Sequence, residues 1–186
     1  MIERSTSSFN TVNVFSEVNI NIVADLYGVG VEGISMDNIV NVYSGITTQR
    51  DTSTICGGSL DNDGSADSNS INISGTIESD GDISIVGAKA DNTEGNIVSF
   101  SEKIVSAGTV TIAGSNTSNS AVSNKVTIYE TAEIPDTCVL YGGLDKSTNE
   151  NSLEISFNKR LKVGTIINLL KFYAVKVPNS YPHLSG

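Results

Sequence analysis

Residues 71–88 read INISGTIESDGDISIVGA, and this stretch carries the strongest local structural signal in the chain. Isoleucines alternate with small polar residues on both sides of the dipeptide Asp80-Gly81. Alternation with a period of two is typical of a β-strand that buries one face. Asp-Gly tolerates the positive φ angles of a tight two-residue turn. The stretch therefore predicts a β-hairpin, in which two antiparallel strands flank the turn.

Similar alternation extends along the chain in both directions from this stretch. It occurs in residues 10–23, 39–48, 97–100, 109–113 and 125–129. Residues 52–70 are rich in Gly, Ser, Asp and Asn and predict a long surface loop. We expect an all-β fold, namely an antiparallel β-sandwich or barrel-like structure of the jelly-roll or immunoglobulin-like kind. A parallel β-helix is the alternative, and it is less favoured because the turns differ in length and chemistry and show no strict repeat.

The overall composition is that of a globular chain with few helix-forming residues. Of its 186 residues 38% are hydrophobic and 17% are charged, and there is no tryptophan. The net charge of −10 opposes binding to a phosphate backbone, so we expect no nucleic-acid partner. No apolar run approaches the length of a membrane helix, so we expect no membrane insertion.

Charge is distributed unevenly along the chain. Every one of the 21 acidic residues lies at or before Glu154, whereas the segment after it is basic through Lys159, Arg160, Lys162, Lys171 and Lys176. Residues 133–136 (EIPD) predict a break between a β-rich body, residues 1–134, and a C-terminal β segment with a basic tail, residues 135–186. This segment packs either on the same domain or on a neighbouring subunit, and the five basic residues are then the predicted subunit contact.

The sequence predicts no catalytic site. Its one histidine, His183, lies four residues from the end, where no enclosed site is expected. Gly28, Gly30 and Gly33 match the spacing of a dinucleotide-binding fingerprint, but the surrounding residues favour strands over the crossover helix that this fingerprint requires. We therefore expect neither an enzyme nor a bound cofactor.

A weak candidate for calcium binding lies in the acidic stretch of residues 61–67, DNDGSAD. Asp61, Asp63 and Asp67 alternate around Gly64, and calcium prefers several oxygen ligands in a bent loop. Aligned on the glycine, the stretch resembles the core of an EF-hand-type loop. It departs from that pattern at Ser59 in the first position and Ser70 in the twelfth. A solvated acidic turn is the alternative interpretation.

The two cysteines and the N-terminus are the features that indicate in which cellular compartment the chain is made and folds. Cys56 and Cys138 form no CxxC motif, so a zinc site is not expected; they are either buried thiols or a disulfide. The first twenty residues contain no apolar run after Arg4 of the kind found in a secretory signal. We therefore expect synthesis in the cytoplasm without export by such a signal.

The composition resembles that of virion proteins, with few lysines, many small polar residues and short strands. This resemblance implies a non-enzymatic structural protein of a virion, in particular a bacteriophage capsid decoration, tail or fibre component that forms a homo-oligomer or a larger assembly. The alternatives are a bacterial surface adhesin or appendage subunit, located at the cell surface, and a carbohydrate-binding module. A surface glycan is accordingly a further candidate partner.

Overall fold

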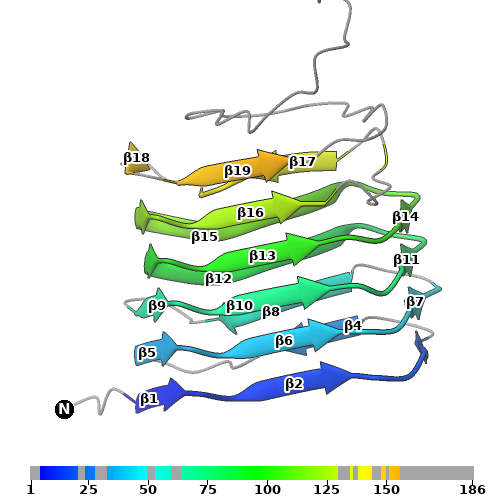
Figure 1. Ribbon diagram of the computed structural model, residues 1–186, viewed down its shortest axis with the longest axis horizontal. Helices are drawn as coiled ribbons and strands as arrows, with labels where there is room; N and C mark the ends of the chain where they lie inside the picture. The colour runs from blue at the N-terminus through cyan, green and yellow to red at the C-terminus, as the bar shows by residue number, and fades with distance from the viewer. Residues whose placement is uncertain are drawn as a thin grey trace, which may run out of the picture.

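The computed structural model describes residues 5–20, 24–27, 33–49, 53–59, 64–129, 135, 138–143, 148–149 and 151–155. These residues form an all-β parallel solenoid of about four turns (Figure 1), in which the chain winds repeatedly through three sheets. Each coil therefore lies beside the next, and strands with equivalent places in successive coils pair side by side.

Two of the three sheets consist of short strands. Sheet B, at the front of Figure 1, contains β2 (Thr11–Val14), β6 (Ile39–Val42), β10 (Ser70–Ile73), β13 (Ile97–Phe100), β16 (Lys125–Ile128) and β19 (Ser152–Ile155). Sheet C, at the right-hand edge, contains β3 (Val18–Ile20), β7 (Ile46–Thr48), β11 (Ile77–Ser79) and β14 (Ile104–Ser106).

Sheet A closes each coil and contains the two longest strands, β12 and β15. Its members are β1 (Ser5–Ser8), β4 (Ala24–Tyr27), β5 (Gly33–Met36), β8 (Ser53–Ser59), β9 (Ser65–Asp67), β12 (Ile83–Glu94), β15 (Val110–Val122), β17 (Cys138–Tyr141) and β18 (Thr148–Asn149). The strands from residues 138–155 pair with β15 and β16 of the preceding coil. The division into residues 1–134 and 135–186 stays a prediction.

The expected antiparallel sandwich or barrel is wrong, because every strand pairing among the described residues is parallel. The predicted hairpin at Asp80-Gly81 is wrong for the same reason. These residues form the corner at which the chain leaves β11 in sheet C and enters β12 in sheet A. The N–H of Gly81 donates to Ser79 Oγ (3.1 Å), and Asp82 Oδ1 accepts from the N–H of Thr109 in the next coil (2.7 Å).

Residues 52–70 are not one long loop, because they contain both β8 and β9. The alternating runs at residues 10–23 and 39–48 each contribute strands to two different sheets, B and C. Alternation thus located strands correctly but did not show which strands pair, because a half-buried strand alternates in the same way in parallel and antiparallel sheets.

The hydrophobic core fills the space enclosed by the three sheets. Sheet B turns one side chain in two inward, so that residues such as Val40, Ile71 and Val98 stack along the solenoid and are fully buried. Ile55, Ile85 and Ile112 form an equivalent buried row in sheet A. Stacking of like side chains at each level buries apolar surface in every coil, which is the main favourable contribution to folding.

A row of asparagines runs along the solenoid at the turn from sheet A into sheet B. Its members are Asn10, Asn38, Asn69, Asn96, Asn124 and Asn151, separated by 28, 31, 27, 28 and 27 residues. Each Nδ2 donates to the Oδ1 of the next asparagine at 2.7–3.0 Å. The backbone N–H of each residue donates to the same Oδ1. We call this row the asparagine ladder.

The ladder also connects each coil with the one before it. Asn96 Nδ2 donates to the carbonyl oxygen of Ala66 (2.7 Å), and Asn151 Nδ2 donates to that of Ala121 (2.8 Å). Asn38, Asn69, Asn96 and Asn124 have no exposed surface. A buried amide without partners would cost free energy, so the complete pairing of these side chains requires each coil to lie in a fixed register with its neighbours.

A residue in the left-handed backbone region stands before five of the ladder asparagines. These residues are Phe9, Asp37, Ser68, Gly95 and Ser123, with φ between 53° and 62°. Only one of them is glycine, although this conformation is unfavourable for side chains other than Asn and Asp. The turn keeps the same shape in each coil while its sequence varies, which is why comparison of turn residues did not reveal a repeat.

The repeat is visible when the sequence is aligned on the ladder. An asparagine is followed two and four residues later by aliphatic or aromatic residues: NTVNV, NIVNV, NSINI, NIVSF, NKVTI and NSLEI, beginning at residues 10, 38, 69, 96, 124 and 151. The interval is not constant, mainly because sheet A varies: Ser59 and Ser65 are six residues apart, whereas their partners Lys89 and Asn92 in β12 are three residues apart. The register of β12 and β15 also shifts between Ala90 and Asn92. The sequence therefore has no fixed period.

A row of glycines occupies equivalent positions in the long strands of sheet A. A Cβ on Gly57 would lie 2.4 Å from the carbonyl oxygen of Gly87, and one on Gly87 would lie 2.4 Å from that of Gly114. A Cβ on Gly114 would lie 2.1 Å from the carbonyl oxygen of Gly142, so this position has no room for a side chain either. Glycine is required here because the backbone of the next coil occupies the space of a side chain.

We expect Asn96→Ala to lower the free energy of unfolding by about 3 kcal/mol, because it leaves buried partners in both adjacent coils without their hydrogen bonds. The matched control is Asn72→Ala, which removes an exposed asparagine–asparagine hydrogen bond and should cost no more than about 0.5 kcal/mol. Urea denaturation followed by circular dichroism measures both variants. Equal losses would contradict a special role for the buried ladder.

Gly87→Ala should lower the free energy of unfolding by about 2 kcal/mol, because the added methyl group forces adjacent backbones apart. Gly45→Ala is the control, since the nearest atom to its added Cβ would be the carbonyl oxygen of Thr76 at 3.6 Å, an ordinary van der Waals contact. Thermal unfolding of the two variants tests this, and a stable Gly87→Ala protein would show that the coils can separate at little cost.

Candidate binding surface

The outer face of sheet B carries a second row of asparagines, which is exposed. Asn41 Nδ2 donates to Asn13 Oδ1 (2.9 Å), and Asn72 Nδ2 donates to Asn41 Oδ1 (2.9 Å). Ser99 and Thr127 occupy the next two places in the same register. We call Asn13, Asn41 and Asn72 the amide row. Because their side chains point outward from a regular sheet, they present amide groups to solvent at regular spacing.

An exposed aromatic column lies beside the amide row, two residues further along each strand. Phe15 and Tyr43 stack with their ring centroids 5.1 Å apart and their planes 7° from parallel. The backbone holds them in register, since the N–H of Tyr43 donates to the carbonyl oxygen of Val14 (2.9 Å). Phe15 is 72% exposed and Tyr43 is 51% exposed. Large exposed rings on a well-ordered sheet are a common feature of binding surfaces.

The column continues with smaller residues before it reaches another ring. Ser74 and Ser101 occupy its next two places, and Tyr129 follows, with backbone N–H groups that donate to carbonyls of the preceding coil throughout. The hydroxyl groups of Ser74 and Ser101 donate back to the carbonyl oxygens of Val42 (3.4 Å) and Ile73 (3.2 Å). The column therefore contains two aromatic positions, two short ones and a further aromatic.

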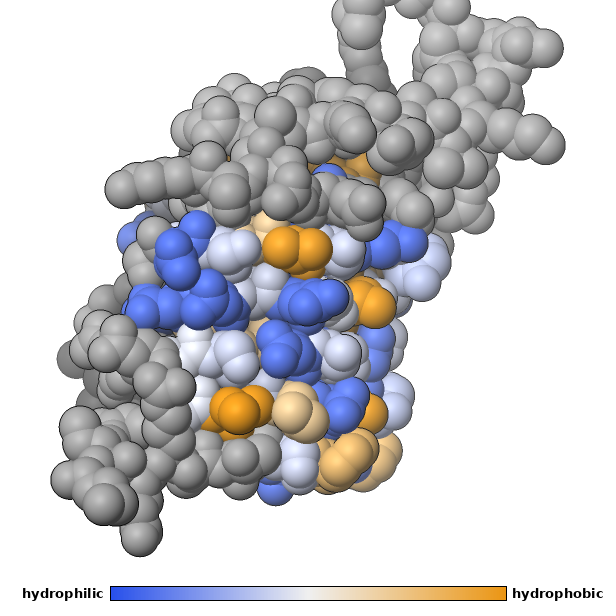
Figure 2. All heavy atoms as spheres, turned by 90° about the vertical axis from the view of Figure 1, so that its left-hand side faces the viewer, coloured by the Kyte–Doolittle hydropathy of each residue, from blue (hydrophilic) through white to orange (hydrophobic). Residues whose placement is uncertain are grey.

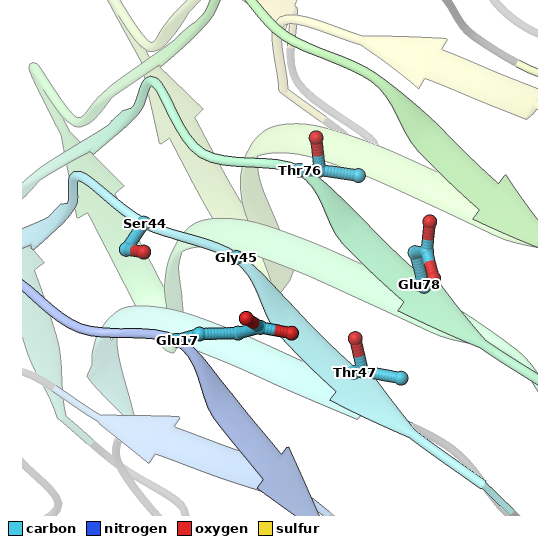
Figure 3. A pocket seen from close by; sticks show the side chains of 6 residues that line it. All are labelled: Glu17, Ser44, Gly45, Thr47, Thr76 and Glu78. Carbon is cyan, nitrogen blue, oxygen red and sulfur yellow. The ribbon is translucent and has the colours of Figure 1, made fainter.

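A shallow pocket opens at the adjoining corner between sheets B and C. It is lined by Glu17, Ser44, Gly45, Thr47, Thr76 and Glu78, with a volume of about 290 Å³. The side chains of Glu17, Thr47 and Glu78 come from three successive coils and lie along the outer surface of the corner (Figure 3). Backbone hydrogen bonds from Val18 to Gly45 and from Ile46 to Thr76, both 2.9 Å, hold these coils together. The pocket offers carboxylates and hydroxyls rather than an apolar cavity.

Of the predicted calcium ligands, the structure describes only Asp67. It lies in β9 beside Glu94 of the next coil, and Asp61 and Asp63 lie outside the described residues. Burial raises the pKa of the Asp67 carboxyl, and the nearby charges of Glu94 and Asp37 raise it further, against a hydrogen bond from Ser65. Within the described ranges, no three His, Cys, Asp or Glu side chains are grouped as metal ligands. Calcium binding stays a prediction.

The predicted subunit contact cannot be placed. Lys159, Arg160, Lys162, Lys171 and Lys176 all lie outside the described residues, as does His183. Gly28 and Gly30 of the dinucleotide-like spacing lie outside them as well, and Gly33 begins β5, a strand rather than a helix.

The two cysteines are free thiols in separate places. Cys138 belongs to the main core, whereas Cys56 packs with Val86, Ala113 and Tyr141 in a smaller cluster. Burial raises the pKa of each thiol to about 12. At neutral pH both are therefore protonated, and neither has the thiolate character of a nucleophile.

The sequence did not indicate the aromatic column. Phe15 and Tyr43 are 28 residues apart in the sequence and become neighbours only because one coil separates them. The signal that would have located them is an aromatic residue five positions after a ladder asparagine, which occurs after Asn10, Asn38 and Asn124.

No protein-family model matches the chain, and neither a curated protein nor a solved structure is significantly similar to it. In the part of the chain that the structure covers, no helix has the length and apolar character needed to cross a membrane.

Asp67→Asn should raise the melting temperature at pH 7. A carboxyl whose pKa is raised by folding binds its proton more tightly in the folded state. The free energy of unfolding therefore falls as the pH rises above 3.8, the ordinary pKa of an aspartate. The neutral amide avoids this loss, and the advantage should vanish near pH ~3, where the carboxyl is protonated. Asp80→Asn removes the same charge from an exposed corner and serves as the control. A gain for Asp67→Asn that persists in acid would contradict this explanation.

Proposed function

We propose that the chain is a non-enzymatic structural protein of a virion, of the bacteriophage capsid decoration, tail or fibre kind. The observation that carries this proposal is the asparagine ladder, in which hydrogen bonds link the asparagines that precede the six strands of sheet B. Such a ladder resists shear and bending between coils, because movement of one coil would leave the amides of its neighbours unpaired. A rigid body suits a component that transmits or withstands force.

The chemistry of the described surface supports a structural role. The two cysteines are buried and protonated. The side of the solenoid in Figure 2 is mainly hydrophilic where its residues are described, with apolar residues separated by polar ones. The net charge of −10 favours solubility at the high local concentrations of an assembly.

A bacterial surface adhesin or appendage subunit is the second candidate, because the aromatic column and amide row provide a surface for a ligand outside the assembly. A virion component and a surface subunit share the same rigid scaffold and differ in location. Capsid or tail genes directly beside the gene for this chain would favour the virion, and genes for export or anchoring would favour the cell surface.

The assembly role predicts that the chain forms oligomers in solution. Light scattering coupled to size-exclusion chromatography should give a multiple of the 19.5 kDa chain mass. Replacement of Lys159, Arg160, Lys162, Lys171 and Lys176 by glutamine in the full chain should shift the mass toward that of the monomer, because the basic tail would lose its attraction to acidic neighbours.

The control is the double variant Lys89→Gln and Lys103→Gln, which removes exposed lysines from the solenoid body. It should leave the mass unchanged. A strictly monomeric wild-type chain would argue against the assembly role, whereas oligomers that survive the five tail substitutions would rule out the basic tail as the contact.

A further inference from the structure

The ring of Tyr43 has one face covered and one face available. Phe15 of the preceding coil stacks on it at 5.1 Å, while the coil on the other side places only Ser74 at the equivalent position. Tyr43 accordingly keeps half of its surface exposed. Phe15 fixes the orientation of the Tyr43 ring, so a planar or flat ligand can stack on the remaining face without first ordering the ring.

Two short residues separate this ring from a second tyrosine in the aromatic column. The hydroxyl groups of Ser74 and Ser101 donate to backbone carbonyls, and Tyr129 follows them in the column. Adjacent parallel strands lie about 4.8 Å apart, so three strand spacings place the Tyr43 and Tyr129 backbones about 14 Å apart. Tyr129 is 47% exposed and presents its ring to the same outer face.

Polar groups flank the aromatic column on both sides. The amide row lies two residues before the column and offers both N–H donors and carbonyl acceptors. Across the corner lie the carboxylates of Glu17 and Glu78 and the hydroxyls of Thr47 and Thr76. An aromatic platform between neutral amides and hydrogen-bond acceptors matches a ligand with an apolar ring face and a rim of hydroxyl groups.

We propose that this face binds a neutral oligosaccharide, with one pyranose ring stacked on Tyr43 and its hydroxyl groups paired with the amide row and the corner pocket. The carboxylates accept hydrogen bonds from sugar hydroxyls and repel anionic ligands, as does the net charge of −10. A nucleic acid would also stack on the rings, but its phosphates meet the same repulsion. This binding activity goes beyond the structural role proposed above and is measured independently of oligomer formation.

The full chain is tested on a printed array of neutral hexose, deoxyhexose and N-acetylhexosamine oligosaccharides, with sialylated, sulfated and uronic-acid glycans on the same slide. We expect binding to a subset of the neutral glycans and none to the anionic ones. An array without binding to any neutral glycan, or with binding confined to anionic glycans, overturns the proposal.

Tyr43→Ser is the decisive variant, because the next two coils already carry serine at this position and the substitution is compatible with the fold. Its affinity for the strongest neutral glycan on the array, measured by isothermal titration calorimetry, should fall by about tenfold through loss of the stacking platform. Tyr43→Phe keeps the ring and should retain affinity within about twofold.

Val105→Ala is the matched control, since Val105 is 41% exposed on sheet C, away from the column. It should bind like the wild type. Equal affinity of Tyr43→Ser and the wild type overturns the proposal. So does a Tyr43→Ser variant that changes only the solution mass, because the column would then be a contact between copies of the chain.

Discussion

The need to pair every buried amide at the turn between sheets A and B constrains the whole structure. The chain bends there through a left-handed residue, and the backbone N–H of the following asparagine donates to a side-chain oxygen instead of a carbonyl of the neighbouring strand. An asparagine supplies the missing donor and acceptor from its side chain, and it does so correctly only if an identical residue stands one coil away. Register between coils, inward stacking of Ile and Val, and the outward rows of sheet B all follow from this requirement.

The all-β class and several strand positions could be predicted from the sequence, whereas the pairing of strands could not. Residues 97–100 form β13 as expected, and residues 125–128 form β16. Alternation reports which face of a strand is buried, and this is the same for a hairpin and for a solenoid coil. Asp80-Gly81 was misinterpreted because an Asp-Gly corner needs similar local chemistry whether the chain then returns beside its own strand or turns into another sheet.

The candidate binding surface could not be predicted from the sequence for a different reason. Phe15 and Tyr43 are far apart in the sequence and adjacent in space only because the coil is 28 residues long at that level. Glu17 and Glu78 line the same pocket for the same reason, although two coils separate them. Local motifs cannot reveal such a surface, since each coil contributes one or two ordinary residues and the arrangement arises from their stacking. The acidic stretch around Asp67 was conspicuous in the sequence because all its members lie in one segment.

The asparagine ladder also means that the solenoid can lengthen or shorten only by whole coils. A coil that was added or removed in part would place an aliphatic side chain opposite a buried amide, whereas a whole coil preserves all the rows. Gene duplication within such a chain can therefore extend the body only in steps, each of about 4.8 Å, without altering its cross-section. The intervals of 27 to 31 residues differ mainly in sheet A, where Ser59 and Ser65 are six residues apart and their partners Lys89 and Asn92 only three. Sequence can therefore be inserted within sheet A while the ladder stays in place.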